Sequence, residues 1–287
     1  MKKEIFNFTT LKVHICSKTK SLFLQLAQPE PSKKNLINEK MLIELESLFS
    51  WLSQHIEIHS VAITGQDNYF SKGFDLDEFV SLPEKRFQEL LEKYQKLVYV
   101  MFFLPQTIIA NLQSGGAGAG LELAMGADIR LAHEQNYFSF DHLKQALVPS
   151  GGGIGFSTEL IPNSFIRSWL LSPHSIDNQA LKGSGFIHTF LNKDEEEKVL
   201  TDILTNISNQ APVARIQTKR SLLEAILPGL DRTINFEKKF ALAGLAMNDW
   251  RKKINDSKKG TPQGFVKARD LNLLLKGEPQ PKKENLQ

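Results

Sequence analysis

Three short apolar segments in the first half of the chain have the length and composition of buried β-strands. They cover residues 22–26, 61–64 and 108–110. Pro29 follows the first segment and Gly65 ends the second, and both residue types interrupt regular structure. We therefore expect strands at these three positions, joined by longer connections.

Helical periodicity fills the connections between these strands. Apolar residues recur at steps of three and four from Met41 to Leu52 and again from Phe87 to Met101. Asn38 is the expected N-cap of the first helix, and a third helix is expected to begin near Leu121. Because strands alternate with helices up to about residue 190, the pattern predicts an α/β fold with right-handed crossovers.

The last third of the chain has helical patterns without strand patterns. Pro228–Gly229 is expected to break this helical region once, and the residues after Gly277 are expected to form a loose tail. The sequence thus predicts an α/β core over residues 1–193 and an all-helical region over 194–287. The helices are expected over residues 194–208, 216–227 and 232–254.

Composition excludes several classes of protein and site. The formal net charge of the 287 residues is +3 and the basic residues are scattered, which disfavours a nucleic-acid partner. Cys16 is the single cysteine, so neither an internal disulfide nor a cysteine metal site is expected, and no His, Asp or Glu spacing indicates a metal. The most apolar stretch, Leu97–Leu104, is too short to span a bilayer. We expect a soluble cytoplasmic protein without a membrane partner.

A glycine-rich run lies between the strand at 108–110 and the helix expected after it. Gly115, Gly116, Gly118 and Gly120 fall within six residues. A phosphate-binding P-loop would continue with Gly-Lys-Ser/Thr, and a dinucleotide fingerprint would need glycine at Leu121. A glycine turn without function is a further interpretation.

A fourth interpretation of the run is an oxyanion site. A strand–loop–helix junction exposes backbone N–H groups that lack partners within the helix, and the helix dipole adds positive charge at the same place. Such groups stabilise a developing oxyanion, and small residues let a substrate carbonyl approach the backbone. Glu122 follows in the first helical turn, where its carboxylate can reach the same pocket.

Several segments of the chain match one known family pattern in order and spacing. They are Val61–Gly65 with Tyr69–Leu76, Ala117–Met125 with Asp128–Ala132, Phe138–Gly153 and, more weakly, Ala180–Ile187. In these segments the sequence resembles the crotonase (enoyl-CoA hydratase/isomerase) superfamily. The likeness covers about residues 20–270, and the order and spacing of the segments together are specific. The resemblance implies a spiral of β-β-α units followed by a helical region that packs in trimers. It also implies an acyl-coenzyme A thioester as substrate, with no separate cofactor.

The resemblance also implies roles for individual residues. Two backbone N–H groups, those of Phe74 and Ala119, correspond to the pair that binds the thioester oxygen. Gly151 begins a run that corresponds either to an acyl-chain contact or only to a tight turn. The positions expected to contact the substrate are Lys72, Leu76, Gly118, Gly120 and Gly151.

One departure from the family pattern concerns the catalytic residues. Hydratases of the family hold a water between two glutamates. Glu122 matches the first glutamate, but His142 stands at the position of the second, with Asp141 beside it. An imidazole transfers protons near neutral pH, so His142 is a candidate acid or base, and Asp141 is an alternative one. Ala119 also replaces the usual middle glycine.

Three hypotheses follow from the sequence. The first is an acyl-CoA enzyme of the hydratase/isomerase type, in which Glu122 moves a proton and His142 assists. The second is an acyl-CoA-binding homologue with little or no catalysis, because the second glutamate is missing. The third is a nucleotide-binding protein built on the incomplete glycine fingerprint.

Overall fold

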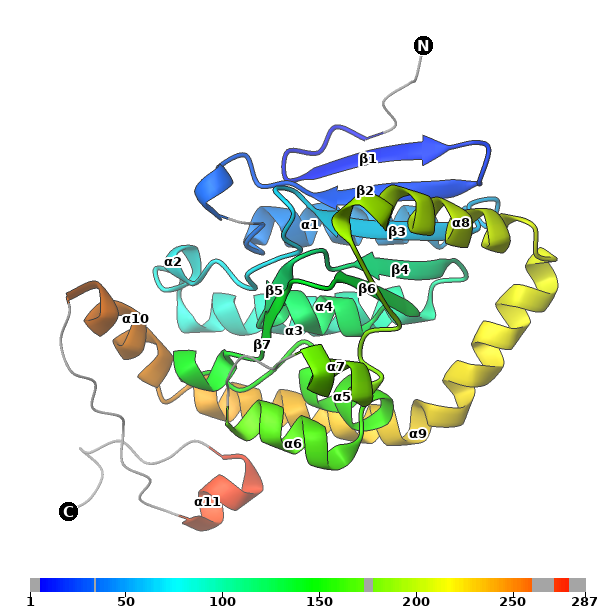
Figure 1. Cartoon of the computed structure of the whole chain (residues 1–287). Helices are drawn as coiled ribbons and strands as arrows, with labels where there is room; N and C mark the ends of the chain where they lie inside the picture. Colours follow the sequence, from blue (N-terminus) through cyan, green and yellow to red (C-terminus); the bar gives the residue numbers. More distant parts are fainter. Residues whose placement is uncertain (1–5, 34, 173–177, 260–270, 279–287) are drawn as a thin grey trace, which may run out of the picture.

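The computed structural model describes residues 6–33, 35–172, 178–259 and 271–278 (Figure 1). The strands are β1 Leu11–Cys16, β2 Ser21–Leu26, β3 Ser60–Gly65, β4 Thr107–Asn111, β5 Gly115–Ala117, β6 Ile129–His133, β7 Tyr137–Ser139 and β8 Thr189–Leu191. The α-helices are α1 Glu39–Leu52, α2 Leu76–Phe79, α3 Glu84–Phe103, α4 Ala119–Met125, α5 Gly153–Leu160, α6 Asn163–Leu171, α7 Asn178–Ser184, α8 Glu196–Ser208, α9 Pro212–Leu245, α10 Asp249–Lys259 and α11 Leu271–Lys276. Short 3-10 helices are η1 Pro31–Lys33, η2 His142–Gln145 and η3 Lys193–Glu195.

A six-stranded sheet in the order β1-β2-β3-β4-β6-β8 organises the first two thirds of the chain. β1 and β2 form an antiparallel hairpin, and each later neighbour pairs in parallel. Parallel neighbours need crossover connections, which α1, α3 and the segment with α4 supply. A second sheet of two parallel strands, β5 and β7, lies beside the carboxyl end of β4 (Figure 1). The expected α/β architecture is confirmed.

Apolar side chains on the two faces of the large sheet belong to two clusters. The main core joins one face to α1 and α3 and includes Leu24, Leu45 and Tyr94. The smaller cluster includes Leu131 and Leu204 and joins the other face to α8. Because both faces are covered, the central strands are apolar on both sides, which explains the continuous apolar runs in their sequences.

Local signals placed the elements of the core correctly. The carboxamide oxygen of Asn38 accepts a hydrogen bond from the N–H of Met41 at 2.9 Å, so Asn38 is the N-cap of α1 as expected. The three predicted strands are β2, β3 and β4, and α4 begins two residues before the expected start at Leu121. The hairpin partner β1 and the short strands β5, β6, β7 and β8 were not predicted.

The carboxylate of Glu44 ties the N-terminal segment to α1. It accepts hydrogen bonds from the backbone N–H and the hydroxyl of both Thr9 and Thr10, at 2.6–2.9 Å. Burial by itself raises the pKa of Glu44, but these four hydrogen bonds outweigh it and the net pKa is lowered.

We expect Glu44→Gln to lower the free energy of unfolding by about 2 kcal/mol at pH 7, because an amide leaves buried donors without acceptors. Since the folded pKa of Glu44 is below the unfolded one, its contribution exists above the unfolded pKa and is lost as pH falls through the folded pKa. Urea unfolding should therefore show a difference between wild type and variant that narrows in acid. A constant difference down to acid pH would contradict this account.

Two predictions for the C-terminal region are wrong: the break at Pro228–Gly229 and the single helix over residues 232–254. Pro228–Gly229 does not break the helical region, because α9 runs without interruption from Pro212 to Leu245. Leu223, Leu230 and Ile234 are buried on both sides of the proline, and this packing holds the helix together. A proline within a helix bends it, and Figure 1 shows α9 changing direction part-way along.

A break occurs instead between α9 and α10, where Asn248 has a φ of +59°. From Asp194 onward the described residues form helices and no strand, as expected. The division into 1–193 and 194–287, and the trimer packing, stay predictions. Most of the tail expected after Gly277 lies outside the described residues. Among the residues described, no helix has the length and apolar character needed to cross a membrane.

Candidate active site

Two segments far apart in the sequence meet at the amino end of α4. The N–H of Ala117 donates to the carbonyl of Ser71 at 2.9 Å. Gly73 follows in a left-handed conformation with a φ of +91°. A Cβ atom added at Gly73 would lie 3.0 Å from the amide nitrogen of Ala119. The segment containing Gly73 therefore packs directly against the first residue of α4.

The amides of Phe74 and Ala119 lie next to this contact. Within the described part of the chain, neither N–H donates a hydrogen bond to the backbone or to a side chain. Gly118, with a φ of +48°, precedes Ala119 and accepts the N–H groups of Leu121 and Glu122 on its carbonyl. The chain thus leaves two backbone donors available where the two segments meet.

A cavity of about 290 Å³ opens at this point. Its walls come from the segment before α2, the start of α4, η2 and one side chain of α10. Gly73, Phe74, Gly118 and Ala119 are among them, so both residues whose amides are available line the cavity. The remaining lining residues are Leu36, Lys72, Asp75, Leu76, Asp77, Asp141, His142, Gln145, Leu147 and Ile254.

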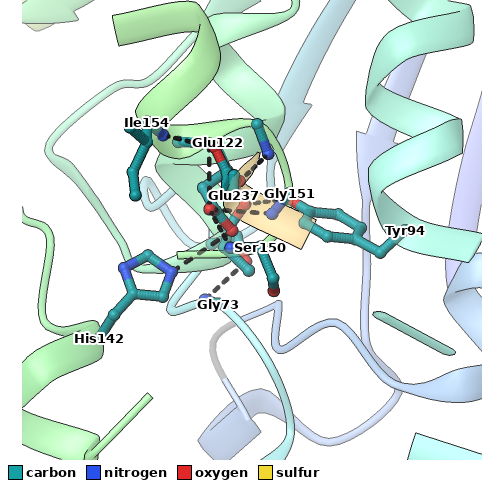
Figure 2. Close-up of polar contacts among 12 residues, drawn as sticks. Gly73, Tyr94, Glu122, His142, Ser150, Gly151, Ile154 and Glu237 are labelled. Atoms are coloured by element: carbon teal, nitrogen blue, oxygen red, sulfur yellow. Dashed lines mark hydrogen bonds and ion pairs between the residues drawn. The ribbon is translucent and has the colours of Figure 1, made fainter. Parts of the chain in front are cut away.

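The side chain of Glu122 is completely buried behind the cavity wall. Its Oε1 accepts hydrogen bonds from the N–H groups of Ser150, Gly151 and Gly153 at 3.0–3.2 Å (Figure 2). Its Oε2 has no hydrogen-bond partner among the described residues. Backbone hydrogen bonds therefore fix one oxygen of this carboxylate, and they leave the other oxygen free for a different contact.

Glu122 Oε2 faces His142. The two atoms in contact, Glu122 Oε2 and His142 Nε2, are 3.3 Å apart, a charge contact without the alignment of a hydrogen bond. Burial lowers the pKa of His142, but the carboxylate of Glu122 outweighs burial and the net pKa is raised. The imidazole therefore forms a buried pair with the carboxylate, and of the two only His142 lines the cavity.

We expect the titration midpoint of His142, followed by NMR, to lie above the ordinary 6.5 and to fall in Glu122→Gln. Because the folded pKa is raised, the pair stabilises the protein fully below the unfolded pKa, and this contribution is lost as pH rises through the folded pKa. His142→Gln should accordingly destabilise the protein more at pH 6 than at pH 9. An unchanged midpoint in Glu122→Gln would show that the carboxylate does not act on His142.

The family profile described as enoyl-CoA hydratase/isomerase matches residues 21–265. The chain belongs to this family. Similar family members include the enoyl-CoA hydratase AKT6-1 of Alternaria alternata, 28% identical over 193 residues, with 64% of this chain and 61% of that protein covered. The mitochondrial Δ(3,5)-Δ(2,4)-dienoyl-CoA isomerase of Mus musculus is 24% identical over 246 residues, with 81% and 75% covered.

Solved structures of enoyl-CoA hydratases share this fold. That of an enoyl-CoA hydratase from Mycobacterium avium subsp. paratuberculosis K-10 has a TM-score of 0.78 at 19% identity and covers 91% of this chain and all of that one. One from Bacillus halodurans has the same TM-score and identity, covering 86% and 99%. The family relationship and the enzyme class expected from the sequence are confirmed.

Two site residues of this family member were not singled out from the sequence. Tyr94 of α3 is fully buried, contacts the ring of Phe74 with centroids 4.9 Å apart, and donates its hydroxyl to the carbonyl of Ala119. Tyr94 thus contacts both residues whose amides are available. Glu237 of α9 accepts hydrogen bonds from the turn that also binds Glu122. Figure 2 shows Glu122 and Glu237 between His142 and Tyr94.

The other predicted site residues divide into two groups. Lys72, Leu76, Gly118 and Asp141 line the cavity with His142, and burial raises the pKa of the Asp141 carboxyl. Gly120 and Gly151 do not line it: a Cβ atom at Gly120 would meet Ser71, and the N–H of Gly151 binds Glu122. Among the described residues, no cluster of three or more His, Cys, Asp or Glu side chains could hold a metal ion.

Proposed function

We propose that this protein isomerises enoyl-CoA thioesters by shifting a double bond through a thioester enolate. The thioester carbonyl enters the cavity between the amides of Phe74 and Ala119. Its oxygen accepts a hydrogen bond from each of these two N–H groups. Each donor aimed at a developing oxyanion contributes about 3 kcal/mol to stabilising the transition state. Support comes from the cavity, whose walls carry these two uncommitted amides and the ring of His142.

The observation that favours isomerisation over hydration is the contact between His142 and Glu122. At 3.3 Å, no water fits between His142 Nε2 and Glu122 Oε2, whereas a hydratase site needs a water held between its two groups. A pair in direct contact acts as one acid/base unit, in which the carboxylate orients the imidazole and stabilises its charged form. One such unit suffices to move a proton.

The proposed step balances without a co-reactant. Neutral His142 takes a proton from C2 of a 3-enoyl thioester, and the electron pair of the broken C–H bond forms the enolate. The enolate oxygen is held by the amides of Phe74 and Ala119 while Glu122 stabilises the imidazolium. The proton then returns to C4, which leaves a 2-enoyl thioester of the same composition.

The test is a direct assay of the purified protein with 3-hexenoyl-CoA and, separately, with crotonyl-CoA. Gain of the conjugated 2-enoyl absorbance from the first substrate is expected. Loss of that absorbance from the second, with formation of 3-hydroxybutyryl-CoA, would show hydration instead. Turnover of neither substrate would overturn the proposal.

A second candidate function is acyl-CoA binding without turnover. It is favoured by Glu122, whose side chain has no exposed surface and which therefore does not reach the cavity directly. Calorimetry with butyryl-CoA distinguishes this candidate, because it predicts binding by a protein that converts neither enoyl substrate. The preferred acyl chain length is to be determined separately, by comparing kcat/KM for a series of substrates of different chain length.

A further inference from the structure

The carboxylates of Glu122 and Glu237, both buried, together accept hydrogen bonds from all the backbone amides of the turn at residues 150–155. Glu122 Oε1 accepts the N–H groups of Ser150, Gly151 and Gly153. Glu237 accepts the remaining ones: Gly152 on Oε1 at 2.6 Å, and Ile154 and Gly155 on Oε2 at 2.9 Å. Every residue from Ser150 to Gly155 therefore donates its backbone hydrogen to one of two glutamates. The shape of the turn depends on both.

Glu237 reaches this turn from the C-terminal helix α9. It is 2% exposed and lies on the buried stripe of α9 formed by Leu230, Ile234, Ala241 and Leu245. A carboxylate on such a stripe is costly unless it is fully hydrogen-bonded, and its three backbone donors meet that condition. The carboxylate of Glu237 thus uses both of its oxygens to bind the backbone of the turn.

The turn fits between the carboxylates because it has almost no side chains. A Cβ atom at Gly153 would lie 2.6 Å from Glu122 Oε1, and one at Gly155 would lie 2.6 Å from Ile234 of α9. Gly152 has a φ of +96°, which turns its N–H toward Glu237 while its neighbours face Glu122. The close packing transmits any movement of Glu237 to the amides that bind Glu122.

We propose that Glu237 is a positioning residue of the active site. From α9 it binds the backbone of the Ser150–Gly155 turn, and this turn fixes the carboxylate of Glu122 so that Oε2 contacts His142. This inference rests on the proposed function for its kinetic consequence only. Loss of Glu237 would leave the N–H groups of Gly152, Ile154 and Gly155 unpaired, and the turn would rearrange to satisfy them.

The charges around Glu237 are consistent with this role. Burial, and then the neighbouring carboxylate of Glu122, raise the pKa of Glu237 above its ordinary value, while its three hydrogen bonds from backbone N–H groups act in the opposite direction. The titratable groups that face it are Glu122, Tyr94 and His142. The two glutamates thus influence each other through charge as well as through the shared turn.

The experiment compares Glu237→Gln and Glu237→Asp with Glu224→Gln, a control on the same helix whose exposed side chain pairs with Arg220. We expect both Glu237 variants to lower kcat on 3-hexenoyl-CoA at least about tenfold with KM nearly unchanged, because binding groups stay in place. The titration midpoint of His142, measured by NMR, should fall in both. The aspartate variant keeps the charge, so a fall there reports misplacement of Glu122 and not simply loss of a negative group.

The outcomes separate this inference from the proposed function. If the wild type turns over neither substrate but the His142 midpoint falls in both variants and not in Glu224→Gln, the positioning role holds and the proposed function does not. Unchanged kcat and unchanged midpoint in folded Glu237 variants would overturn the inference. Should both variants fail to fold, Ile154→Pro replaces them, because it removes one donor of Glu237 and none of Glu122 in the first turn of α5, where proline is tolerated. The same two readouts must then change.

Discussion

Glu122→Gln and His142→Gln are each expected to lower kcat/KM on 3-hexenoyl-CoA by about 10²–10⁴-fold, the usual contribution of a positioned acid or base. The side-chain amide introduced by Glu122→Gln keeps an oxygen for the N–H groups of the turn, but it presents an uncharged –NH₂ group to His142 Nε2. The imidazolium formed on proton abstraction then lacks its counter-charge. In His142→Gln the group that lines the cavity can no longer accept a proton.

Because the two residues act as a unit, the double variant should be no slower than the slower single variant. Glu44→Gln is the matched control, since Glu44 is also a buried carboxylate that accepts hydrogen bonds from backbone N–H groups, but it does not line the cavity. It should lose stability and keep its kcat. Additive losses in the double variant would mean that Glu122 and His142 act in separate steps, and the proposed dyad would be wrong.

The sequence predicted the core of the fold because its signals are local. Residues 39–52 and 84–103 repeat apolar side chains with helical spacing, and β2 to β4 are short apolar runs between turn residues. β1 was missed although Leu11–Cys16 alternates apolar and polar residues, which is the pattern of a half-buried strand. Its pairing with β2 at the edge of the sheet depends on tertiary structure. The continuity of α9 through Pro228 likewise depends on tertiary packing, which local helix propensity cannot predict.

The candidate site shows the same division. Glu122 and His142 could be placed from motif spacing, because both lie within one continuous stretch of the chain. Glu237 lies 82–85 residues from its donors, and no motif surrounds it. One signal was present, an acidic residue at a stripe position of an amphipathic helix, between Ile234 and Ala241. Tyr94 gave no such signal, since an aromatic residue on a helix face is ordinary core.

Gly73→Ala is expected to abolish most catalysis, by about 10²–10³-fold in kcat, the loss associated with one oxyanion donor. The added Cβ atom would lie 3.0 Å from the amide nitrogen of Ala119 and 3.1 Å from the carbonyl oxygen of Ala117, so it occupies the space in which the thioester oxygen would meet the Ala119 N–H. Backbone atoms on both sides leave no flexible group to move aside. The φ of +91° adds strain of about 1–3 kcal/mol, which lowers stability as well.

The strain must be separated from the steric block, and Gly185→Ala does this. Gly185 has a φ of +73°, and a Cβ atom there would meet nothing within 4 Å. The control should therefore show a comparable fall in the urea midpoint with unchanged kcat, whereas Gly73→Ala should lose kcat at temperatures where it is fully folded. If folded Gly73→Ala turns over 3-hexenoyl-CoA at the wild-type rate, the Ala119 amide takes no part in holding the enolate. The catalytic contribution would then have to come from other groups along the cavity.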